Sequence, residues 1–248
     1  MSDFQDATVL ITGAASGIGA ATARLLSERG ASLVLMDQDA QGLAAFPEAA
    51  TIVGDVADPE LWRAADLSGL THAVINAGIA RGGAAIADLE FAEWRQVMAT
   101  NLDGAFLSLT AAMRAIRAGG RGGAVVLTSS VAGLKAGPGI AGYAASKAAL
   151  IHLARVAAIE GAGDGIRVNS IAPAGVETPI WTKQAFFQDL AAEKGGEAAA
   201  YKAIATQSTK LGRFATPDEI ATQIAFLLSE QAAFMTGACL VSDGGYSL

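Results

Sequence analysis

A single cysteine, Cys239, occurs in this chain of 248 residues. An intramolecular disulfide framework is therefore excluded, and the composition fits the reducing cytoplasm. No apolar run approaches the ~20 residues of a membrane-spanning helix, although 52% of the residues are hydrophobic and the mean hydropathy is +0.39. No basic segment leads into an apolar stretch near the first residue, so we expect no signal peptide. The protein is expected to be cytoplasmic, with no membrane partner.

Positive charge and histidine are also scarce. Lys and Arg number 17 against 24 acidic residues, which makes the formal net charge −7. Arg114, Arg117 and Arg121 are the nearest approach to a basic cluster, and their spacing is typical of an exposed helix face and turn. Nucleic-acid binding needs a basic footprint that the sequence lacks. His72 and His152 do not combine with Asp, Glu or Cys in a metal-ligand spacing, so we predict no metal site.

Short apolar runs of strand type alternate with helical segments along the chain. This alternation predicts a parallel sheet with helices on both faces, and so a single α/β domain over residues 1–248 with a doubly wound sheet in three layers. The expected strands are 7–12, 32–36, 51–53, 72–75, 123–128, 166–171 and 238–241. The expected helices are one ending at Arg29, 91–118 with a break near Asn101, 143–160 and 217–229, with clipped helices between 37 and 51 and between 55 and 72.

One long segment, residues 177–212, is helical in character and has no expected strand. Such an excursion from a compact domain is usually a lid or a binding segment, so we expect a helical substrate lid. Its aromatic residues favour a mainly apolar pocket, or else they pack the lid onto the body or onto another subunit. These residues are Trp181, Phe186, Phe187 and Tyr201, with Leu134 and Ile140 upstream.

A glycine-rich turn joins the first expected strand to the first helix. It reads Thr12-Gly-Ala-Ala-Ser-Gly-Ile-Gly19. Glycines here permit a tight turn, a close approach of the backbone to a pyrophosphate and close packing of helix on strand. The helix N-terminus offers free N–H groups to the phosphates. The place of this turn between a strand and a helix predicts a dinucleotide site made by Gly13, Ser16, Gly17, Ile18 and Gly19.

Asp37 ends the second expected strand, about 20 residues beyond this turn. A carboxylate at that place accepts hydrogen bonds from an adenosine ribose and repels a 2′-phosphate. No Lys or Arg lies in the turn or just after Asp37, so NAD is favoured over NADP. The alternative is that Asp37 serves only as a turn residue or a cap.

Tyr143 and Lys147 are four residues apart, and Ser130 lies thirteen residues upstream of the tyrosine. Positions i and i+4 share one helix face, so the phenol and the ammonium can point into one site. A nearby cation lowers the tyrosine pKa from about 10, which makes a usable general acid/base. The Ser130 hydroxyl can orient an alcohol or a carbonyl beside it. Most such pairs only lie on a solvated helix, and the rest of the chain decides against that interpretation.

Taken in order, the motifs resemble the short-chain dehydrogenase/reductase family over essentially the whole chain. The resemblance implies a Rossmann fold, an NAD-dependent oxidoreductase and a homotetramer or homodimer built through the long helices and the last segment. The motifs are Thr12-Gly-xxx-Gly-x-Gly19, Asp55-Val56, Asn76-Ala-Gly78, Asn101, Ser130, Tyr143-xxx-Lys147, Pro173 through Thr178 and Asp243-Gly-Gly245.

The resemblance also implies the roles of individual residues. The implied catalytic set is Asn101, Ser130, Tyr143 and Lys147, in which Asn101 holds a water in a proton relay through Lys147. Tyr143 and Lys147 also contact the cofactor, with Lys147 on the nicotinamide ribose. The other implied cofactor contacts are Asp55 and Val56 at the adenine, Asn76, Ala77 and Gly78 on the adenosine side, and Pro173, Val176 and Thr178 near the nicotinamide.

Two positions depart from the family pattern. Ile75 replaces a common asparagine before Asn76, and Ala174 stands where glycine commonly follows the proline. A Cβ at position 174 could crowd the nicotinamide or shift the loop, which affects the placing of Val176 and Thr178.

The implied reaction is hydride transfer between a secondary alcohol and nicotinamide C4, in which Ser130 and Tyr143 bind the hydroxyl and Tyr143 takes its proton. The apolar lid favours a hydrophobic, cyclic or aromatic substrate. Two alternatives stay open. One is an NADPH-dependent 3-oxoacyl-carrier-protein reductase, against which Asp37 and the missing basic patch argue. The other is a catalytically silent NAD-binding scaffold. Asp243 before two glycines is expected to be a structural turn.

Overall fold

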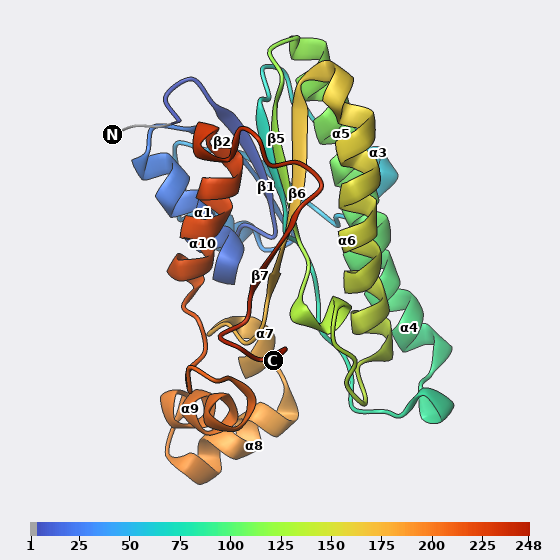
Figure 1. The fold of residues 1–248 in the computed structure, drawn as a ribbon, viewed down its shortest axis with the longest axis vertical. Helices are drawn as coiled ribbons and strands as arrows, with labels where there is room; N and C mark the ends of the chain where they lie inside the picture. Colours follow the sequence, from blue (N-terminus) through green and yellow to red (C-terminus); the bar gives the residue numbers. More distant parts are fainter. Residues whose placement is uncertain (1–3) are drawn as a thin grey trace.

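Seven parallel strands form one sheet in the computed structural model, which describes residues 4–248 (Figure 1). Their order is β3-β2-β1-β4-β5-β6-β7, so the chain starts near the middle and winds outward in both directions. This confirms the doubly wound sheet, with its switch point between β1 and β4. The strands are β1 (Thr8–Thr12), β2 (Ser32–Asp37), β3 (Ala50–Val53), β4 (His72–Ile75), β5 (Gly123–Thr128), β6 (Ile166–Pro173) and β7 (Cys239–Ser242).

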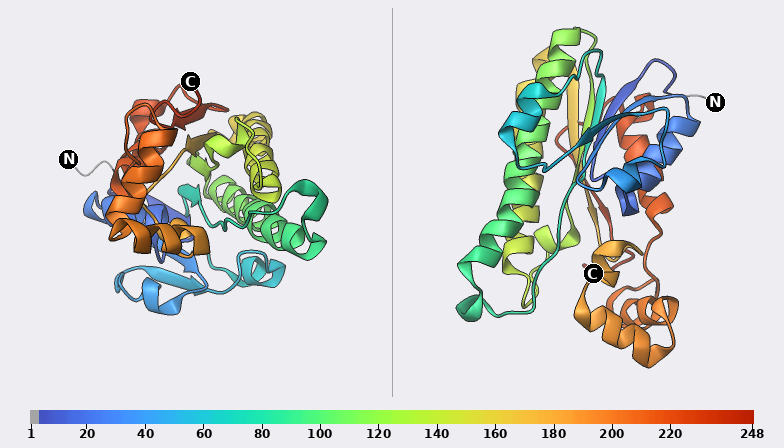
Figure 2. Two further views of the ribbon diagram at one scale, coloured as in Figure 1. Left: turned by 90° about the horizontal axis from the view of Figure 1, so that it is seen from below. Right: turned by 180° about the vertical axis from the view of Figure 1, so that it is seen from behind.

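Helices cover both faces of the sheet and complete three layers. Figures 1 and 2 show α1 (Gly17–Glu28) and α10 (Pro217–Leu228) on one face, and α3 (Pro59–Ala64), α5 (Gly104–Gly119) and α6 (Ala141–Gly161) on the other. The helices expected to be clipped are indeed short, since α2 (Ala40–Leu43) and α3 have four and six residues. Within residues 4–248, no helix combines the length and apolarity needed to cross a membrane.

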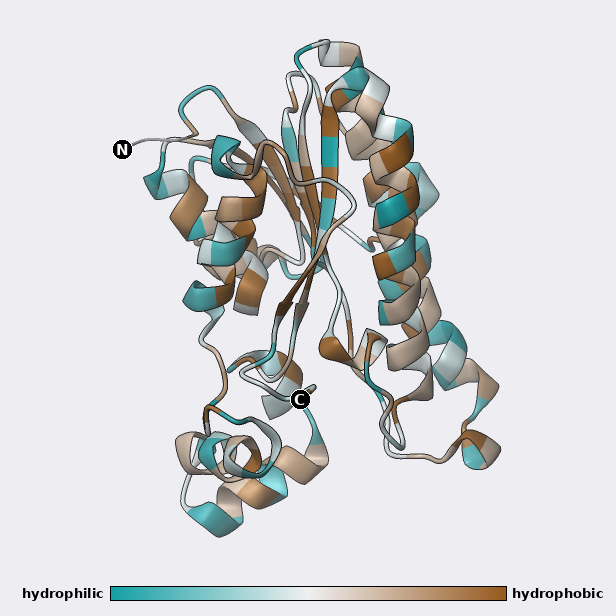
Figure 3. Ribbon diagram, viewed as in Figure 1, coloured by the Kyte–Doolittle hydropathy of each residue, from teal (hydrophilic) through white to brown (hydrophobic). Residues whose placement is uncertain are grey.

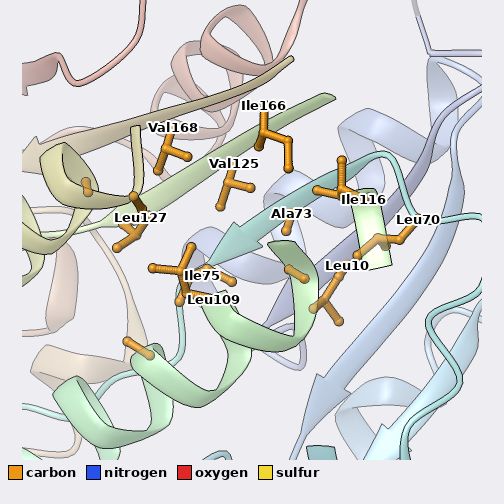
Figure 4. Close-up of a cluster of buried hydrophobic side chains, with 14 of the residues drawn as sticks. Leu10, Leu70, Ala73, Ile75, Leu109, Ile116, Val125, Leu127, Ile166 and Val168 are labelled. Atoms are coloured by element: carbon orange, nitrogen blue, oxygen red, sulfur yellow. The ribbon is translucent and has the colours of Figure 1, made fainter. Parts of the chain in front are cut away.

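The apolar strands are buried on both faces, which explains their lack of polar alternation. Leu10, Val125 and Leu127 face a cluster that includes Leu109 and Ile116 of α5 (Figure 4). The intervening residues of the same strands join a second cluster against α1 and α10. In the hydropathy colouring the central strands are accordingly brown along most of their length (Figure 3).

The long helical stretch after β4 is interrupted, as expected, near Asn101. It consists of α4 (Phe91–Met98), a π-helical turn η2 (Ala99–Asp103) and α5. Single π turns often occur at functional sites. Short 3-10 turns also occur at η1 (Ile86–Asp88), η3 (Val131–Gly133), η4 (Ala162–Asp164) and η5 (Glu230–Ala232).

The segment expected to be a lid is helical and lies beyond the carboxyl ends of the strands (Figure 1). It contains α7 (Pro179–Thr182), α8 (Ala185–Lys194) and α9 (Glu197–Ser208), with no strand between residues 177 and 212. Its end leads into α10, whose start is fixed by a capping box between Thr216 and Glu219.

Candidate active site

In the glycine-rich turn between β1 and α1, the backbone segments pack closely against each other. Gly13 and Gly17 have φ of +68° and +54°, a region that favours glycine. A Cβ added to Gly19 would lie 2.0 Å from the carbonyl oxygen of Gly13. The N-cap Ser16 makes no side-chain hydrogen bond, and the first turn of α1 has no acidic residue. The first N–H groups of α1 are therefore left for an anion such as a pyrophosphate.

Asn76 joins the glycine-rich turn to the end of β4. Its Nδ2 donates to the carbonyl oxygens of Thr12 and Gly13, at 3.1 and 3.3 Å. In return, Thr12 Oγ1 accepts from the backbone N–H groups of Asn76 and Ala77, at 2.9 and 3.0 Å. Thr12 was not among the predicted site residues, although a hydroxyl at the end of a buried strand indicates a residue that binds a neighbouring loop. These bonds hold the switch point of the sheet in shape.

Asp37 lies at the carboxyl end of β2, beside the same turn. Its Oδ2 accepts from Ala15 N at 3.0 Å, and its Oδ1 accepts from Asp39 N at 3.1 Å. Asp37 therefore does stabilise the local turn, as the alternative interpretation holds. A carboxylate has about four acceptor positions, so both oxygens can still accept from a ribose. Residues 38–42 carry no positive charge that would attract a 2′-phosphate.

Asp55 and Val56 follow β3 and differ in exposure. Asp55 is exposed, and its Oδ1 accepts from Ala57 N at 2.9 Å. Val56 is 4% exposed and belongs to the core, where its side chain contacts the position of Gly104. The contact of these two residues with an adenine stays a prediction.

Lys147 is buried at the carboxyl edge of the sheet. It is 4% exposed, and its Nζ donates to the carbonyl oxygen of Thr128 at 2.8 Å. The same Nζ lies 5.7 Å from the ring centroid of Tyr143, so the two side chains do share one face of α6. A Cβ added to Gly78 would lie 3.3 Å from both Lys147 Nζ and Asn101 Oδ1. The ends of β4 and β5, α6 and η2 therefore meet at one point.

Burial dominates the titration of this pair. It lowers the pKa of Lys147 to about 8. It also raises the pKa of Tyr143 above 10.0, while a hydrogen bond with Ser130 acts in the opposite direction. The direction for Tyr143 is thus opposite to the one expected from Lys147 alone, because burial disfavours the charged phenolate.

Ser130 caps the turn η3 between β5 and α6. Its Oγ accepts from Ala132 N at 3.2 Å and donates to the carbonyl oxygen of Pro173 at 3.4 Å. Ser130 is also close enough to Tyr143 to act on the pKa of its phenol, which places Ser130 between the tyrosine and the end of β6. The structure therefore brings Ser130, Tyr143 and Lys147 together.

Asn101 is fully buried in the π-helical turn. Its Oδ1 accepts from Ile79 N at 2.8 Å, and its Nδ2 donates to Ile79 O at 2.9 Å and to Ser146 Oγ at 3.2 Å. Ser146 Oγ in turn donates to the carbonyl oxygen of Tyr143 at 2.7 Å. Asn101 thus supports the start of α6, and its part in a proton relay stays a prediction. Ser146 was not anticipated, because nothing local marks it.

The chain after β6 faces the glycine-rich turn. Ala174 fits without strain, because no non-glycine residue within 4–248 has a positive φ. The crowded position is Gly175, where a Cβ would lie 2.2 Å from the Phe214 ring. Thr178 Cγ2 lies 3.2 Å from the Cβ position of Gly17. Thr178 therefore stands across from the expected pyrophosphate site, and its nicotinamide contact stays a prediction, as do those of Pro173 and Val176.

The lid aromatics mostly form the lid's own core. Phe187 and Tyr201 are 1% and 7% exposed, and their ring centroids are 4.6 Å apart. Trp181 and Phe214 pack against them, whereas Phe186 is half exposed. Of the two alternatives that the sequence left open for Phe187 and Tyr201, the structure supports packing, and this packing is within the lid itself, because a separate set of lid helices needs buried side chains of its own.

The two histidines lie in different surroundings. Within residues 4–248, no group of His, Cys, Asp and Glu is arranged to hold a metal ion. Burial lowers the pKa of His72 to about 4, and its Nδ1 is 2.8 Å from Thr71 Oγ1. His152 is exposed on the outer side of α6.

Known proteins resemble the chain over its whole length. A family model described as enoyl-(acyl carrier protein) reductase matches residues 13–247. Cis-4-hydroxycyclohexanecarboxylate dehydrogenase of Sinomonas cyclohexanicum is 37% identical, with 98% of each chain covered. Cyclohexanol dehydrogenase of Acinetobacter sp. (strain SE19) is 36% identical over 98% of this chain and 96% of its own.

Solved structures agree with this. A short-chain type dehydrogenase/reductase from Mycobacterium marinum superposes with a TM-score of 0.87 at 30% identity, covering 99% of this chain and 97% of its own. Levodione reductase superposes with a TM-score of 0.88 at 35% identity, and 98% of each chain is covered. The likeness therefore extends over nearly the whole chain, including the sheet and the lid segment.

Proposed function

Because the chain belongs to the short-chain dehydrogenase/reductase family, we propose that it interconverts a secondary alcohol and its ketone with NAD as the hydride carrier. The observation that carries this proposal is the meeting of Ser130, Tyr143 and Lys147 beside the glycine-rich turn. The relatives reported above are named as alcohol dehydrogenases, which supports the same class of reaction.

The cofactor supplies the hydride acceptor and donor. The residues of this chain bind the alcohol oxygen and move its proton. Ser130 Oγ orients the hydroxyl, and Tyr143 exchanges the proton with it. A raised pKa keeps Tyr143 protonated near neutrality, which suits its role as the acid in ketone reduction. In oxidation, the charge of Lys147 must act on the phenol to favour its ionised form.

NAD is the cofactor that the site fits best. The turn at Gly13, Gly17 and Gly19 has no room for side chains, and the carboxylate of Asp37 stands where it would repel a 2′-phosphate. A second acidic residue, Asp39, follows close by. Together these charges support NAD over NADP.

The substrate that we propose is a hydrophobic cyclic alcohol. Two relatives are named for hydroxylated cyclohexane rings, and a third for a cyclohexadiene diol. The half-exposed side chains of Leu134 and Phe186 support an apolar entrance. We further propose that the protein is a cytoplasmic homotetramer or homodimer.

Fluorescence titration of the purified protein with NADH and NADPH tests the cofactor assignment. We expect tighter binding of NADH, and a shift towards NADPH in Asp37→Ser, because the repulsion of a 2′-phosphate is removed. Asp66→Ser, which changes an exposed carboxylate elsewhere, should leave the preference unchanged. Tighter binding of NADPH by the wild type would overturn the assignment and favour the 3-oxoacyl-carrier-protein reductase.

Oxidation of cyclohexanol with NAD⁺ tests the reaction itself. The wild type should turn over, and Tyr143→Phe should lose about 10²–10⁴-fold in kcat while it still binds NADH, because the proton acceptor is removed. Turnover retained in Tyr143→Phe contradicts the catalytic assignment. If the wild type binds NADH but is inactive on a panel of alcohols and ketones, the non-catalytic scaffold is favoured.

A further inference from the structure

Residues 243–248, here called the strap, lie between the lid and the turn that follows Ser130 (Figure 1). Asp243 shapes the strap, since its Oδ1 accepts from Gly245 N at 2.9 Å and its Oδ2 from Ser247 N at 2.8 Å. Asp243 is therefore the structural turn residue that the sequence predicts. The strap is held from two sides, by the end of the lid and by the turn that follows Ser130.

On the lid side, the strap sits directly on residues 209–211. Leu211 N donates to Gly244 O at 3.0 Å. A Cβ added to Gly245 would lie 2.8 Å from the side chain of Lys210. This close approach joins the strap to the segment in which the lid ends.

On the catalytic side, the strap is held by Lys135, five residues after Ser130. Lys135 Nζ donates to the carbonyl oxygen of Tyr246 at 2.8 Å and lies 5.0 Å from the centroid of the Tyr246 ring. The turn that carries Lys135 is itself fixed to α6, because a Cβ on Gly133 would lie 2.7 Å from Ala148 N. The strap therefore connects the Ser130 turn with the end of the lid.

We propose that the strap closes one side of the substrate site, and that Lys135 and Tyr246 determine how large an alcohol is accepted. This inference rests on the proposed function. Leu134 and Leu211, on the two segments that the strap joins, are 50% and 70% exposed, as an apolar entrance requires. The contact made by Lys135 is exposed to water, so it opens at little cost and a bulky substrate competes with it.

The test compares cyclohexanol with 4-tert-butylcyclohexanol as substrates, each with NAD⁺. Lys135→Met and Tyr246→Leu should raise kcat/KM for the bulky alcohol relative to cyclohexanol by about two- to fivefold, because the side of the site opens. The affinity for NADH should not change. Amide hydrogen exchange of residues 243–248 should become faster in Lys135→Met. Lys202→Met is the matched control, since Lys202 is an exposed lysine of α9. It should change neither the ratio of kcat/KM values nor the hydrogen exchange of residues 243–248.

Two failures are distinguishable. If the wild type binds NADH but does not oxidise either alcohol, the proposed substrate class is wrong, and hydrogen exchange still tests the strap. If Lys135→Met leaves the exchange of residues 243–248 unchanged, the inference is overturned. It is equally overturned if the wild type is active and both variants keep its ratio of kcat/KM values.

Discussion

At the scale of single residues, the buried ammonium of Lys147 dominates the site. It has a single protein acceptor, the carbonyl oxygen of Thr128, and no carboxylate forms an ion pair with it in the described part of the chain. Burial therefore favours its neutral form and lowers its pKa from 10.5 to about 8. A charged Lys147 therefore lowers the stability of the folded protein, and such buried charges are typical of functional sites.

The pH dependence of unfolding should reveal this cost. Between the folded pKa of about 8 and the unfolded value of 10.5, the unfolded chain binds one more proton at Lys147 than the folded chain. Stability must therefore rise with pH in this window, by about 3 kcal/mol in total for a shift of this size. We expect urea unfolding of the wild type to gain stability relative to Lys147→Met from pH 8 to 10. If the stabilities of the wild type and of Lys147→Met change with pH in parallel, folding does not lower the pKa of Lys147.

At the scale of elements, one buried hydrogen bond inside the lid holds Thr178, the lid residue that contacts the glycine-rich turn. Tyr201 of α9 donates through its OH to the carbonyl oxygen of Thr178 at 3.1 Å, and the Thr178 side chain lies directly beside Gly17. Burial, the first of several causes, raises the pKa of Tyr201 to about 12, so the donor proton is kept. Tyr201 is thus suited to position Thr178.

Removing this hydrogen bond should weaken cofactor binding. We expect Tyr201→Phe to raise the Kd for NADH and the KM for NAD⁺ with little change in kcat, and to cost about 1 kcal/mol of stability. Phe187→Leu disturbs the same lid core without removing a hydrogen bond, and should lower stability while it keeps the affinity for NADH. An equal loss of affinity in both variants would assign the effect to lid packing alone. These quantities follow from NADH titration, steady-state kinetics and urea unfolding.

At the scale of the whole molecule, the outer sides of α5 and α6 carry apolar side chains. They line a groove of about 660 Å³ that includes Leu102, Phe106, Leu153 and Val156. Phe106 is 53% exposed, and Ile159, farther along α6, is 80% exposed. Exposed apolar surface of this kind is typical of interfaces, and it supports the proposed homotetramer or homodimer.

Light scattering coupled to gel filtration should show more than one copy of the chain in the wild type. Phe106→Glu should lower the measured mass, because a carboxylate buried in an apolar interface is costly. Ile86→Glu changes an exposed apolar residue of η1 and should leave the mass unchanged. A wild type that elutes as a monomer at micromolar concentration would contradict the assembly.

What the sequence by itself determined was local. Runs of apolar residues predicted the strands, and the spacing of glycines and of Tyr143 and Lys147 marked the site, because periodicity and short spacing depend only on neighbours along the chain. The break near Asn101 and the helical lid were predicted in the same way.

The tertiary structure decided which distant groups meet. Thr12 forms hydrogen bonds with Asn76 and Ala77, Ser146 forms one with Asn101, and Tyr246 forms one with Lys135. The burial of Phe187 and Tyr201 inside the lid, and the raised pKa of Tyr143, also depend on what packs around them. Burial and long-range hydrogen bonds are properties of the folded chain, since a residue's solvent exposure is set by elements far from it in sequence.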